Sequence, residues 1–408
     1  MEDIKTSDTA ATHIDLESFG VSKELGFVLE NPLTDLPEYY RPWMALAAEV
    51  THLIEAHQLR DRVKEMPLLS TQYLRSHREQ RLAHLALGFI TMGYVWQEGQ
   101  DQPAKVLPKQ LAVPYCTVSD LLGLPPILVY ADCVLANWKL KDPSKPMEIG
   151  NLDTVFTFPG GESCKGFLLV SLLVEKAAST GLKGVAMALN SMRTHDTDRL
   201  HEALVMVTQS LRRMKECFQL MHGHVDPTSF HGILRIFFSG WKNNPMLPDG
   251  LRYEGVFQEP LQLSGGSAAQ SSAIQCFDAL LGVMQTDASA GAFLKHMHDY
   301  MPPAHRALIQ TISSRPTMRS YVLSASDSHL FQTYNTCVSH MVDLRDYHLN
   351  TVARYIIVPG NRARATAAGC PLRGACPALD ERGTGGSNPL VFLKAVRDST
   401  RSALINKA

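Results

Sequence analysis

The strongest constraint on the fold is an apolar repeat between residues 198 and 221. Apolar side chains recur there at alternating spacings of four and three residues, namely at Leu200, Leu204, Val207, Leu211, Met214, Phe218 and Met221. This period places all of them on one face of an α-helix, and charged residues fill the other faces. The segment therefore predicts a helix packed in the core of a helical bundle.

Helical periodicity recurs along the chain, and strand-like alternation is scarce. Further helices are predicted over residues 38–59, 78–96, 337–358 and 390–404, and another begins with Asp226 as N-cap and Pro227 at its first position. Short strand candidates occur at residues 106–118 and 153–158. Residues 359–389 have no apolar period and predict a long internal loop.

The fold class predicted from these patterns is all-α with two domains of unequal size. Residues 1–156 form a small, mostly helical N-terminal domain with short strands, and residues 163–408 form a large helical domain. The segment TFPGGES, residues 157–163, is the predicted boundary, because consecutive glycines interrupt the helical pattern there.

Composition excludes several classes of protein. The 408 residues include 39 Lys plus Arg and 40 Asp plus Glu, a net charge of −1, which argues against a nucleic-acid partner. The longest uncharged run near the N-terminus, residues 82–96, is shorter than the ~20 residues a bilayer requires, and the polar, acidic N-terminus does not resemble a signal peptide. We therefore expect a cytosolic protein with no membrane partner, whose eight cysteines are reduced thiols. None of them forms a CxxC pair, which argues against a zinc site built on cysteines.

Common catalytic motifs are missing from the sequence. GGESCKG, residues 160–166, lacks the Gly-Lys-Ser/Thr offset of a phosphate-binding loop, and neither GxGxxG nor GxSxG occurs. The histidines of HGH and HMH, at residues 222–224 and 296–298, lie two apart and so point to different faces of a helix. Without a carboxylate pair or a nucleophile triad, the pattern favours chemistry carried by a cofactor.

Two polar residues interrupt apolar helix faces. His348 follows Cys337, Met341 and Leu344 on one stripe, so it is either an ordinary core histidine or an axial ligand to a flat apolar cofactor such as haem. In the second case Arg345, one turn earlier, could meet a haem propionate. Arg235 lies among aromatic residues, where it either extends outward to solvent or binds a carboxylate ligand.

Three further segments predict either core or pocket. Phe167 and Ser171 lie one turn apart in KGFLLVSLLVE, and Tyr130 lies in an apolar helix that Pro125 and Pro126 are expected to open. SGGSAAQSS, residues 264–272, contains a capping-box pattern from Ser267 to Gln270, which predicts either a plain helix start or a close approach of backbone to a ligand.

At these residues the chain resembles the vertebrate indoleamine 2,3-dioxygenase family. The resemblance runs from about Leu16 to Leu404 and includes LPPILVYADCVLANW, KGFLLVSLLVE, LRIFFSGWKNNP, YEGV, GGSAAQSS, YMPPAHR, LRDYHL and RGTGGS in order. MPLLS, HREQRLAHL and MGYVWQEG are nearest to the second paralogue of that family. Several independent blocks in one order are more specific than any single motif.

The resemblance implies a cytosolic, monomeric enzyme that binds haem b and needs an electron donor to keep the iron ferrous. The implied reaction inserts both atoms of O2 across the indole C2–C3 bond of L-tryptophan to give N-formylkynurenine, the first step of the kynurenine pathway. By position, His348 would be the proximal iron ligand and Arg235 would bind the substrate carboxylate. The substrate pocket and the distal side of the iron would include Tyr130, Phe167, Ser171, Phe230, Ser267, Ala268 and Thr384. The haem would be supported by Arg345, Asp278 and Gly266.

Two residues depart from the family pattern. His231 stands where the family commonly has a second aromatic residue, and Phe238 replaces a commonly smaller apolar one. A polar ring and a larger side chain in an indole pocket predict weaker substrate affinity than in the tightest family members.

Two other functions remain open from the sequence. VPYCTV and LRYEGV resemble the phosphotyrosine inhibitory motifs proposed for the family, so Tyr115 and Tyr253 could recruit a phosphotyrosine-reading protein with little catalysis. That hypothesis requires both tyrosines to be accessible. The third possibility is a plain helical binding protein in which His348 belongs to the core.

Overall fold

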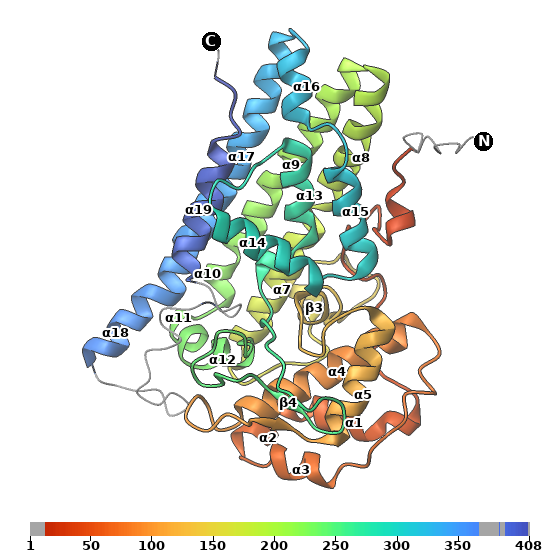
Figure 1. Ribbon diagram of the computed structural model, residues 1–408, viewed down its shortest axis with the longest axis vertical. Helices are drawn as coiled ribbons and strands as arrows, with labels where there is room; N and C mark the ends of the chain where they lie inside the picture. Colours follow the sequence, from red (N-terminus) through yellow and green to blue (C-terminus); the bar gives the residue numbers. More distant parts are fainter. Residues whose placement is uncertain (1–12, 367–382, 384–387, 407–408) are drawn as a thin grey trace, which may run out of the picture.

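The computed structural model describes residues 13–366, 383 and 388–406 of the chain. Most of the elements drawn in red to yellow gather at the lower end of Figure 1, whereas the first of them, η1 (Leu16–Phe19), lies higher, near the N-terminus. In chain order they are η1 (Leu16–Phe19), η2 (Glu38–Tyr40), α1 (Arg41–Ala48), α2 (Val50–Glu55), α3 (Leu59–Glu65), α4 (His77–Trp96), β1 (Val106–Leu107), α5 (Lys109–Leu122), α6 (Tyr130–Cys133), β2 (Lys139–Leu140), η3 (Ile149–Asn151) and β3 (Leu152–Asp153).

Longer helices follow and form most of the upper part of Figure 1, where α8, α9, α13 and α17 run along the long axis. The elements are α7 (Gly161–Ala177), α8 (Ser179–Thr194), α9 (Thr197–Gln219), α10 (Met221–His224), α11 (Pro227–Ser229), η4 (Phe230–Leu234), α12 (Arg235–Phe237), β4 (Arg252–Tyr253), η5 (Ala268–Gln270), α13 (Ser272–Leu281), α14 (Ala288–Met297), η6 (His298–Tyr300), α15 (Pro303–Ser313), α16 (Met318–Ser324), α17 (Ser328–Val352), η7 (Ala353–Ile357), α18 (Val358–Thr366) and α19 (Pro389–Arg401). The all-α prediction is confirmed, because each of the four strands among the described residues has only two residues.

Helix α9 confirms the helix predicted from the apolar repeat that begins at Leu200. Asp196 caps its N-terminus by accepting a hydrogen bond from the backbone N–H of Arg199 at 3.1 Å. Leu200, Leu204 and Val207 of the repeat are fully buried, and α9 packs against α7, α8 and α17. The apolar seam of α9 is therefore the centre of the helical bundle.

One of the two small sheets joins segments that are distant in the sequence, and the other joins two segments of the same loop region. β1 pairs in parallel with β4, with Val106 opposite Arg252, and β2 pairs antiparallel with β3, with Lys139 opposite Asp153. β4 thus returns to the elements of the first 156 residues. One continuous cluster of buried apolar residues extends from Ile14 to Ile405, so the division into two domains at residues 156–163 stays a prediction.

The prediction of one continuous helix over residues 38–59 is wrong. The helix breaks at Glu49 into α1 and α2, and His57 then takes a left-handed conformation with φ 55° before α3 begins. The break lets α1 and α2 each turn an apolar face onto α4. The α4 prediction is confirmed, and its start is fixed by a capping box in which Ser76 and Glu79 each bond the other's backbone N–H.

The strand predicted over residues 106–118 is wrong beyond Leu107. Pro108 ends β1, and α5 follows, with Leu111, Tyr115, Val118 and Leu122 buried at spacings of four, three and four. Those spacings are helical, and the short apparent alternation had hidden them. The strand predicted over residues 153–158 is reduced to β3, Leu152–Asp153.

Two further predictions fail at turns. The apolar helix expected after Pro125 and Pro126 is only the four-residue α6, because the two prolines remove backbone donors and the carboxylate of Asp132 binds the Val129 N–H at 3.1 Å. Part of the loop expected over residues 359–389 is helical, since α18 continues the chain to residue 366. No helix in the described residues combines the length and the apolar character needed to cross a bilayer.

Candidate active site

His348 lies in the last third of α17, on its inward face. The helix begins at the N-cap Asp327, and Cys337, Met341 and Leu344 of the predicted stripe are buried. The ring of Phe218 from α9 packs edge-on against His348 with centroids 5.4 Å apart. Burial of the imidazole, assisted by the nearby Arg345 cation, lowers the pKa of His348 to about 4, so the ring is neutral near pH 7.

Neither ring nitrogen of His348 hydrogen-bonds to any residue that the structure describes. A neutral imidazole with an uncommitted nitrogen, half-buried on a rigid helix, has the chemistry of an axial haem ligand. The residues present therefore fit the cofactor that the sequence predicted.

Arg345, one turn before His348, is committed to a buried carboxylate. Its Nη1 and Nη2 donate to the two carboxylate oxygens of Asp278 at 2.8 and 2.6 Å, and Nη1 also donates to the hydroxyl of Thr400. The three residues come from α17, α13 and α19, so this pair connects three helices behind His348. Asp278 thus has a defined role in holding Arg345, and a contact of Arg345 with a propionate stays a prediction.

Aromatic side chains from three segments of the predicted site contact one another. The ring of Phe167 on α7 lies 5.0 Å from that of Phe230 on η4 and 5.4 Å from that of Phe238, which follows α12. Phe238 is buried and also meets Phe158 edge-on at 5.6 Å. Ser171 lies one turn beyond Phe167, whose carbonyl accepts the Ser171 hydroxyl proton at 2.8 Å. The predicted grouping of Phe167, Phe230 and Phe238 is therefore present as ring contacts.

The segment that carries Arg235 is not the regular α-helix that the sequence predicted. Asp226 does cap it, accepting from the Ser229 N–H at 2.7 Å, and Pro227 follows. Phe230–Leu234 then forms a single π turn, η4, before α12 begins at Arg235. His231 and Arg235 are both buried, at 6% and 3% exposure.

A second π turn faces the first, and neither turn has a recognisable pattern in the sequence. η7 follows α17, and its Tyr355 lies edge-on to Phe230 of η4 at 6.0 Å. The Tyr355 hydroxyl lies 3.1 Å from the carbonyls of both Met221 and Val225. Since π turns widen a helix locally and occur often at functional sites, this pairing supports a site between α17 and the Arg235 segment.

The glycine-containing segment 264–271 lies against the Tyr130 turn. The Tyr130 N–H donates to the side-chain oxygen of Gln270 at 3.0 Å, and the amide nitrogen of Gln270 donates to the Gly265 carbonyl at 2.9 Å. Gln270 is therefore used in tertiary contacts, and the predicted capping box with Ser267 is wrong. Ser267 caps only the short η5, and α13 starts later with Ser271 as its N-cap.

Close backbone approach in this region occurs at Gly240. A Cβ at Gly240 would lie 2.3 Å from the Gly265 nitrogen, whereas one at Gly266 would meet nothing closer than 3.6 Å. Ser267 is half-buried and Ala268 exposed. Thr384, the remaining predicted pocket residue, lies outside the described residues.

A hydrogen-bonded Ser-His-Asp arrangement does exist, although none was predicted. The His84 ring nitrogens lie 2.8 Å from the Asp132 carboxylate and 3.1 Å from the Ser119 hydroxyl. His84 and Asp132 are fully buried and Ser119 is 1% exposed, so no substrate can reach the serine. The arrangement fixes α4, α5 and the Tyr130 turn to one another, and it is not a hydrolytic site.

The tyrosines of the signalling hypothesis are inaccessible. Tyr115 and Tyr253 are both 0% exposed, and the Tyr253 hydroxyl donates to the Pro126 carbonyl at 2.6 Å. A kinase can phosphorylate a tyrosine only if the tyrosine hydroxyl enters the kinase active site. The folded protein therefore does not present either residue for phosphorylation. The structure thus removes the main support for that hypothesis.

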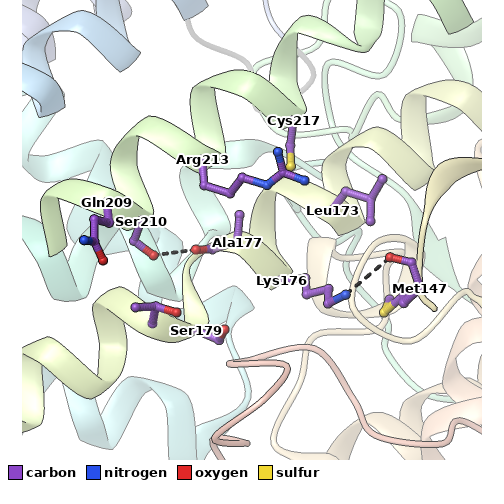
Figure 2. A pocket seen from close by; sticks show the side chains of 10 residues that line it. Met147, Leu173, Lys176, Ala177, Ser179, Gln209, Ser210, Arg213 and Cys217 are labelled. Carbon is purple, nitrogen blue, oxygen red and sulfur yellow. Dashed lines mark hydrogen bonds between the residues drawn. The ribbon is translucent and has the colours of Figure 1, made fainter. Parts of the chain in front are cut away.

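One hollow of about 300 Å³ lies away from these residues. Figure 2 shows it between α7, α8 and α9, with Lys176, Arg213 and Cys217 pointing into it. None of the predicted site residues lines it. The candidate active site is therefore the region between His348, the aromatic cluster and the Arg235 segment, in which α7, α17 and the two π turns meet.

Comparison with known proteins identifies the family. The family model described as Indoleamine 2,3-dioxygenase matches residues 15–403. Indoleamine 2,3-dioxygenase 2 of Mus musculus is 49% identical over 405 residues, which cover 99% of each chain. Indoleamine 2,3-dioxygenase 1 of Rattus norvegicus is 47% identical over 397 residues, 96% of each chain, and a protein named myoglobin from Haliotis diversicolor is 37% identical over 95% of this chain and 98% of its own. The resemblance predicted from the sequence is confirmed, and the chain belongs to the indoleamine 2,3-dioxygenase family of haem-dependent oxidoreductases.

Proposed function

We propose that this enzyme binds haem b through His348 and uses O2 to open the indole ring of L-tryptophan, giving N-formylkynurenine. The observation that carries the proposal is the neutral, uncommitted imidazole of His348, whose ring contacts Phe218, a residue that packs with Phe167 and Phe230 against one apolar cluster. We further propose that it works as a cytosolic monomer and that an electron donor keeps the iron ferrous.

The chemistry suits a site without a general base. When bound, ferrous haem supplies the activation of O2, so the protein needs only to bind, orient and desolvate the substrate. Ser171 is a poor proton acceptor, because a hydroxyl is only weakly basic, and the hydrogen bond recorded for it is the one that it donates to the Phe167 carbonyl. Its role is then to line the distal side of the iron.

Substrate recognition divides between an ion pair and aromatic packing. Arg235 is 3% exposed, and the planar fork of a guanidinium matches the two oxygens of the substrate carboxylate. The rings of Tyr130, Phe167 and Phe230 pack against the indole. Thr384, Ser267 and Ala268 complete the pocket in this proposal.

His231 and Phe238 are the two proposed pocket residues at which this chain departs from the family pattern. Both are buried beside the aromatic cluster, at 6% and 4% exposure. An imidazole packs less favourably against an indole than a phenyl ring does, and the Phe238 ring occupies space close to Phe167. We therefore expect a KM for L-tryptophan well above the low micromolar range, and a low micromolar value would contradict this part of the proposal.

The proposal is tested with reduced holo-protein, L-tryptophan and O2, followed by mass spectrometry of the product. The expected product has the mass of the substrate plus two oxygen atoms, and both are labelled when the gas is ¹⁸O2. His348→Ala should lose the Soret band as well as the product. A wild-type protein that keeps its Soret band and binds O2 reversibly, yet gives no product, would place it with haem proteins that only carry the gas.

A comparison of two substrates tests whether Arg235 binds the substrate carboxylate. Arg235→Gln should raise the KM for L-tryptophan by about tenfold or more, because a buried charge-assisted pair is lost. The same variant should change the KM for tryptamine, which lacks the carboxylate, far less. Arg213→Gln removes an exposed arginine of α9, paired with Glu216 at 3.0 Å, and serves as the control. Equal effects of Arg235→Gln on both substrates would show that Arg235 does not bind the carboxylate.

A further inference from the structure

Glu175 is a buried acid that the proposed chemistry does not use. It lies near the end of α7 and is 1% exposed. Its Oε1 accepts a hydrogen bond from the Tyr130 hydroxyl at 3.0 Å and another from the Ser271 hydroxyl. Its Oε2 is fully buried and has no hydrogen-bond partner.

The position of Glu175 on α7 connects it with the candidate site. Phe167, Ser171 and Glu175 follow one another at spacings of four residues, so they share one face of the helix. The two predicted pocket residues therefore lie one and two turns before Glu175 on the same side.

No basic side chain in the described part of the chain pairs with this carboxyl group. Among the residues that the structure describes, no Lys, Arg or His forms an ion pair with Glu175. The nearest basic side chains along α7 and α9 point into the separate hollow of Figure 2, where Lys176 donates to the Met147 carbonyl at 3.3 Å and Arg213 pairs with Glu216. An ionised carboxylate without a cation in such surroundings is strongly disfavoured.

The titratable groups that face Glu175 are also uncharged. They are the phenol of Tyr130 from α6 and the thiol of Cys276 from α13, and burial raises the pKa of each well above its usual value. Burial likewise raises the pKa of Glu175, against the opposing effect of its two hydroxyl donors. Burial therefore favours the uncharged form of all three titratable groups, Tyr130, Glu175 and Cys276.

The two donors to Glu175 belong to the two segments that form the other walls of the site. Tyr130 lies in the α6 turn, and its N–H is bound by Gln270. Ser271 follows Gln270 directly and caps α13, with its hydroxyl 3.5 Å from the Ile274 N–H. One carboxyl oxygen on α7 therefore holds both the Tyr130 side chain and the end of the Gly266–Ser267 segment.

We infer that Glu175 is a positioning residue of the substrate pocket: as an uncharged carboxyl group it receives the hydroxyls of Tyr130 and Ser271 and so fixes the Tyr130 ring relative to Phe167 and Ser171. This inference rests on the proposed function, because it assigns Tyr130 to the indole pocket. Glu175 then acts in its protonated form, and a negative charge at this position is not required.

The first experiment compares Glu175→Leu with Glu175→Gln. Leucine removes the acceptor and leaves two buried hydroxyls without a partner, so kcat/KM for L-tryptophan should fall about tenfold or more. Glutamine keeps an oxygen acceptor without charge and should rescue most of that loss. Glu162→Gln changes an exposed acid on the same helix and should leave kcat/KM unchanged. Glu175→Gln as impaired as Glu175→Leu would overturn the inference, because an ionised carboxylate would then be the required form.

A double-mutant cycle with Tyr130→Phe distinguishes positioning from general stability. If Glu175 acts through the Tyr130 hydroxyl, Glu175→Leu should cost much less in the Tyr130→Phe background than in the wild type. If the double variant shows the product of the two single-variant losses in kcat/KM, the two residues act independently, which would contradict the inference. The cycle can also be read from the shift of the Soret band when L-tryptophan binds, which needs no turnover.

Infrared difference spectroscopy tests the inference without any activity. At neutral pH the wild-type spectrum minus that of Glu175→Gln should contain the C=O stretching band of a protonated carboxylic acid. A carboxylate band in its place overturns the inference even if the enzyme makes N-formylkynurenine. If the wild-type protein makes no product, the proposed function fails while this band still decides the state of Glu175.

Discussion

The buried pair of Arg345 and Asp278 gives a prediction whose size can be worked from the structure. Both residues are 8% exposed, and two direct bonds of 2.8 and 2.6 Å join them. Asp278→Leu leaves the Arg345 cation buried without its partner, which costs about 3–5 kcal/mol. At about 1.4 kcal/mol per factor of ten, the unfolding equilibrium constant should rise by roughly two to four powers of ten.

Replacing both partners should recover most of that loss. In Asp278→Leu combined with Arg345→Met no charge remains to be buried, and Thr400 keeps a partner because its hydroxyl also donates to the Val396 carbonyl at 2.9 Å. Asp346→Asn is the matched control. It removes a more exposed acid from α17 that pairs with Arg397 at 2.7 Å, and it should cost less than about 1 kcal/mol.

The assay is urea unfolding of the haem-free protein, followed by titration with haem. Asp278→Leu no less stable than Asp346→Asn would refute the argument, since the pair would then not be effectively desolvated. The double variant also separates two roles of Arg345. If Arg345 supports a propionate as well as Asp278, the double variant recovers its stability but binds haem more weakly than the wild type.

Three other predictions follow from single positions. Gly166→Ala would place a Cβ 2.2 Å from the His224 carbonyl oxygen and should destabilise the protein by about 1–3 kcal/mol or more, measured by the urea midpoint. The control is Gly223→Ala, whose Cβ would meet nothing within 4 Å and which should cost less than about 1 kcal/mol. Equal costs for the two variants would refute the close packing at Gly166. Burial lowers the pKa of His305 to about 3, so between pH 6.5 and 3 the unfolded chain binds one more proton there than the folded protein, and stability should fall by at most about 1.4 kcal/mol per pH unit as the pH decreases. His305→Phe should remove about 2 kcal/mol of the stability loss that the wild type shows between pH 6.5 and 5, and an unchanged pH dependence would mean that the histidine is accessible to water. Finally, a tyrosine kinase should add no phosphate to Tyr115 or Tyr253 of the native protein, as read by intact mass, and stoichiometric phosphorylation would contradict their burial.

The periodic parts of the fold could be predicted from the sequence, and the irregular parts could not. The 4-3 spacing of α9 and the capping box of α4 contain their own evidence, because local chemistry decides both. Residues 106–118 were misassigned because apolar residues a few positions apart satisfy a strand pattern and a helix pattern equally well until the buried set is known. The break at Glu49 depends on how α1 and α2 pack against α4, which no local pattern records.

The candidate site shows the same division. His348 and Arg235 stand out in the sequence because each is polar on an apolar face, and the family resemblance then supplied roles for them. The partner of Arg345, the facing π turns and the contacts of Gln270 depend on residues far apart in the chain, as between Arg345 and Asp278. Glu175 has no distinctive sequence pattern, because an acid near the end of a helix is common and only its burial makes it unusual.

Whether His348 holds the haem that opens the indole ring can be measured in a single-turnover reaction of the reduced holo-protein with L-tryptophan and ¹⁸O2, run side by side on the wild type and His348→Ala. We expect a wild-type Soret band and a product that carries two labelled oxygen atoms, with both absent from His348→Ala. A labelled product from His348→Ala with its haem retained, or a wild type with an intact Soret band and no labelled product, would contradict the proposed role of His348.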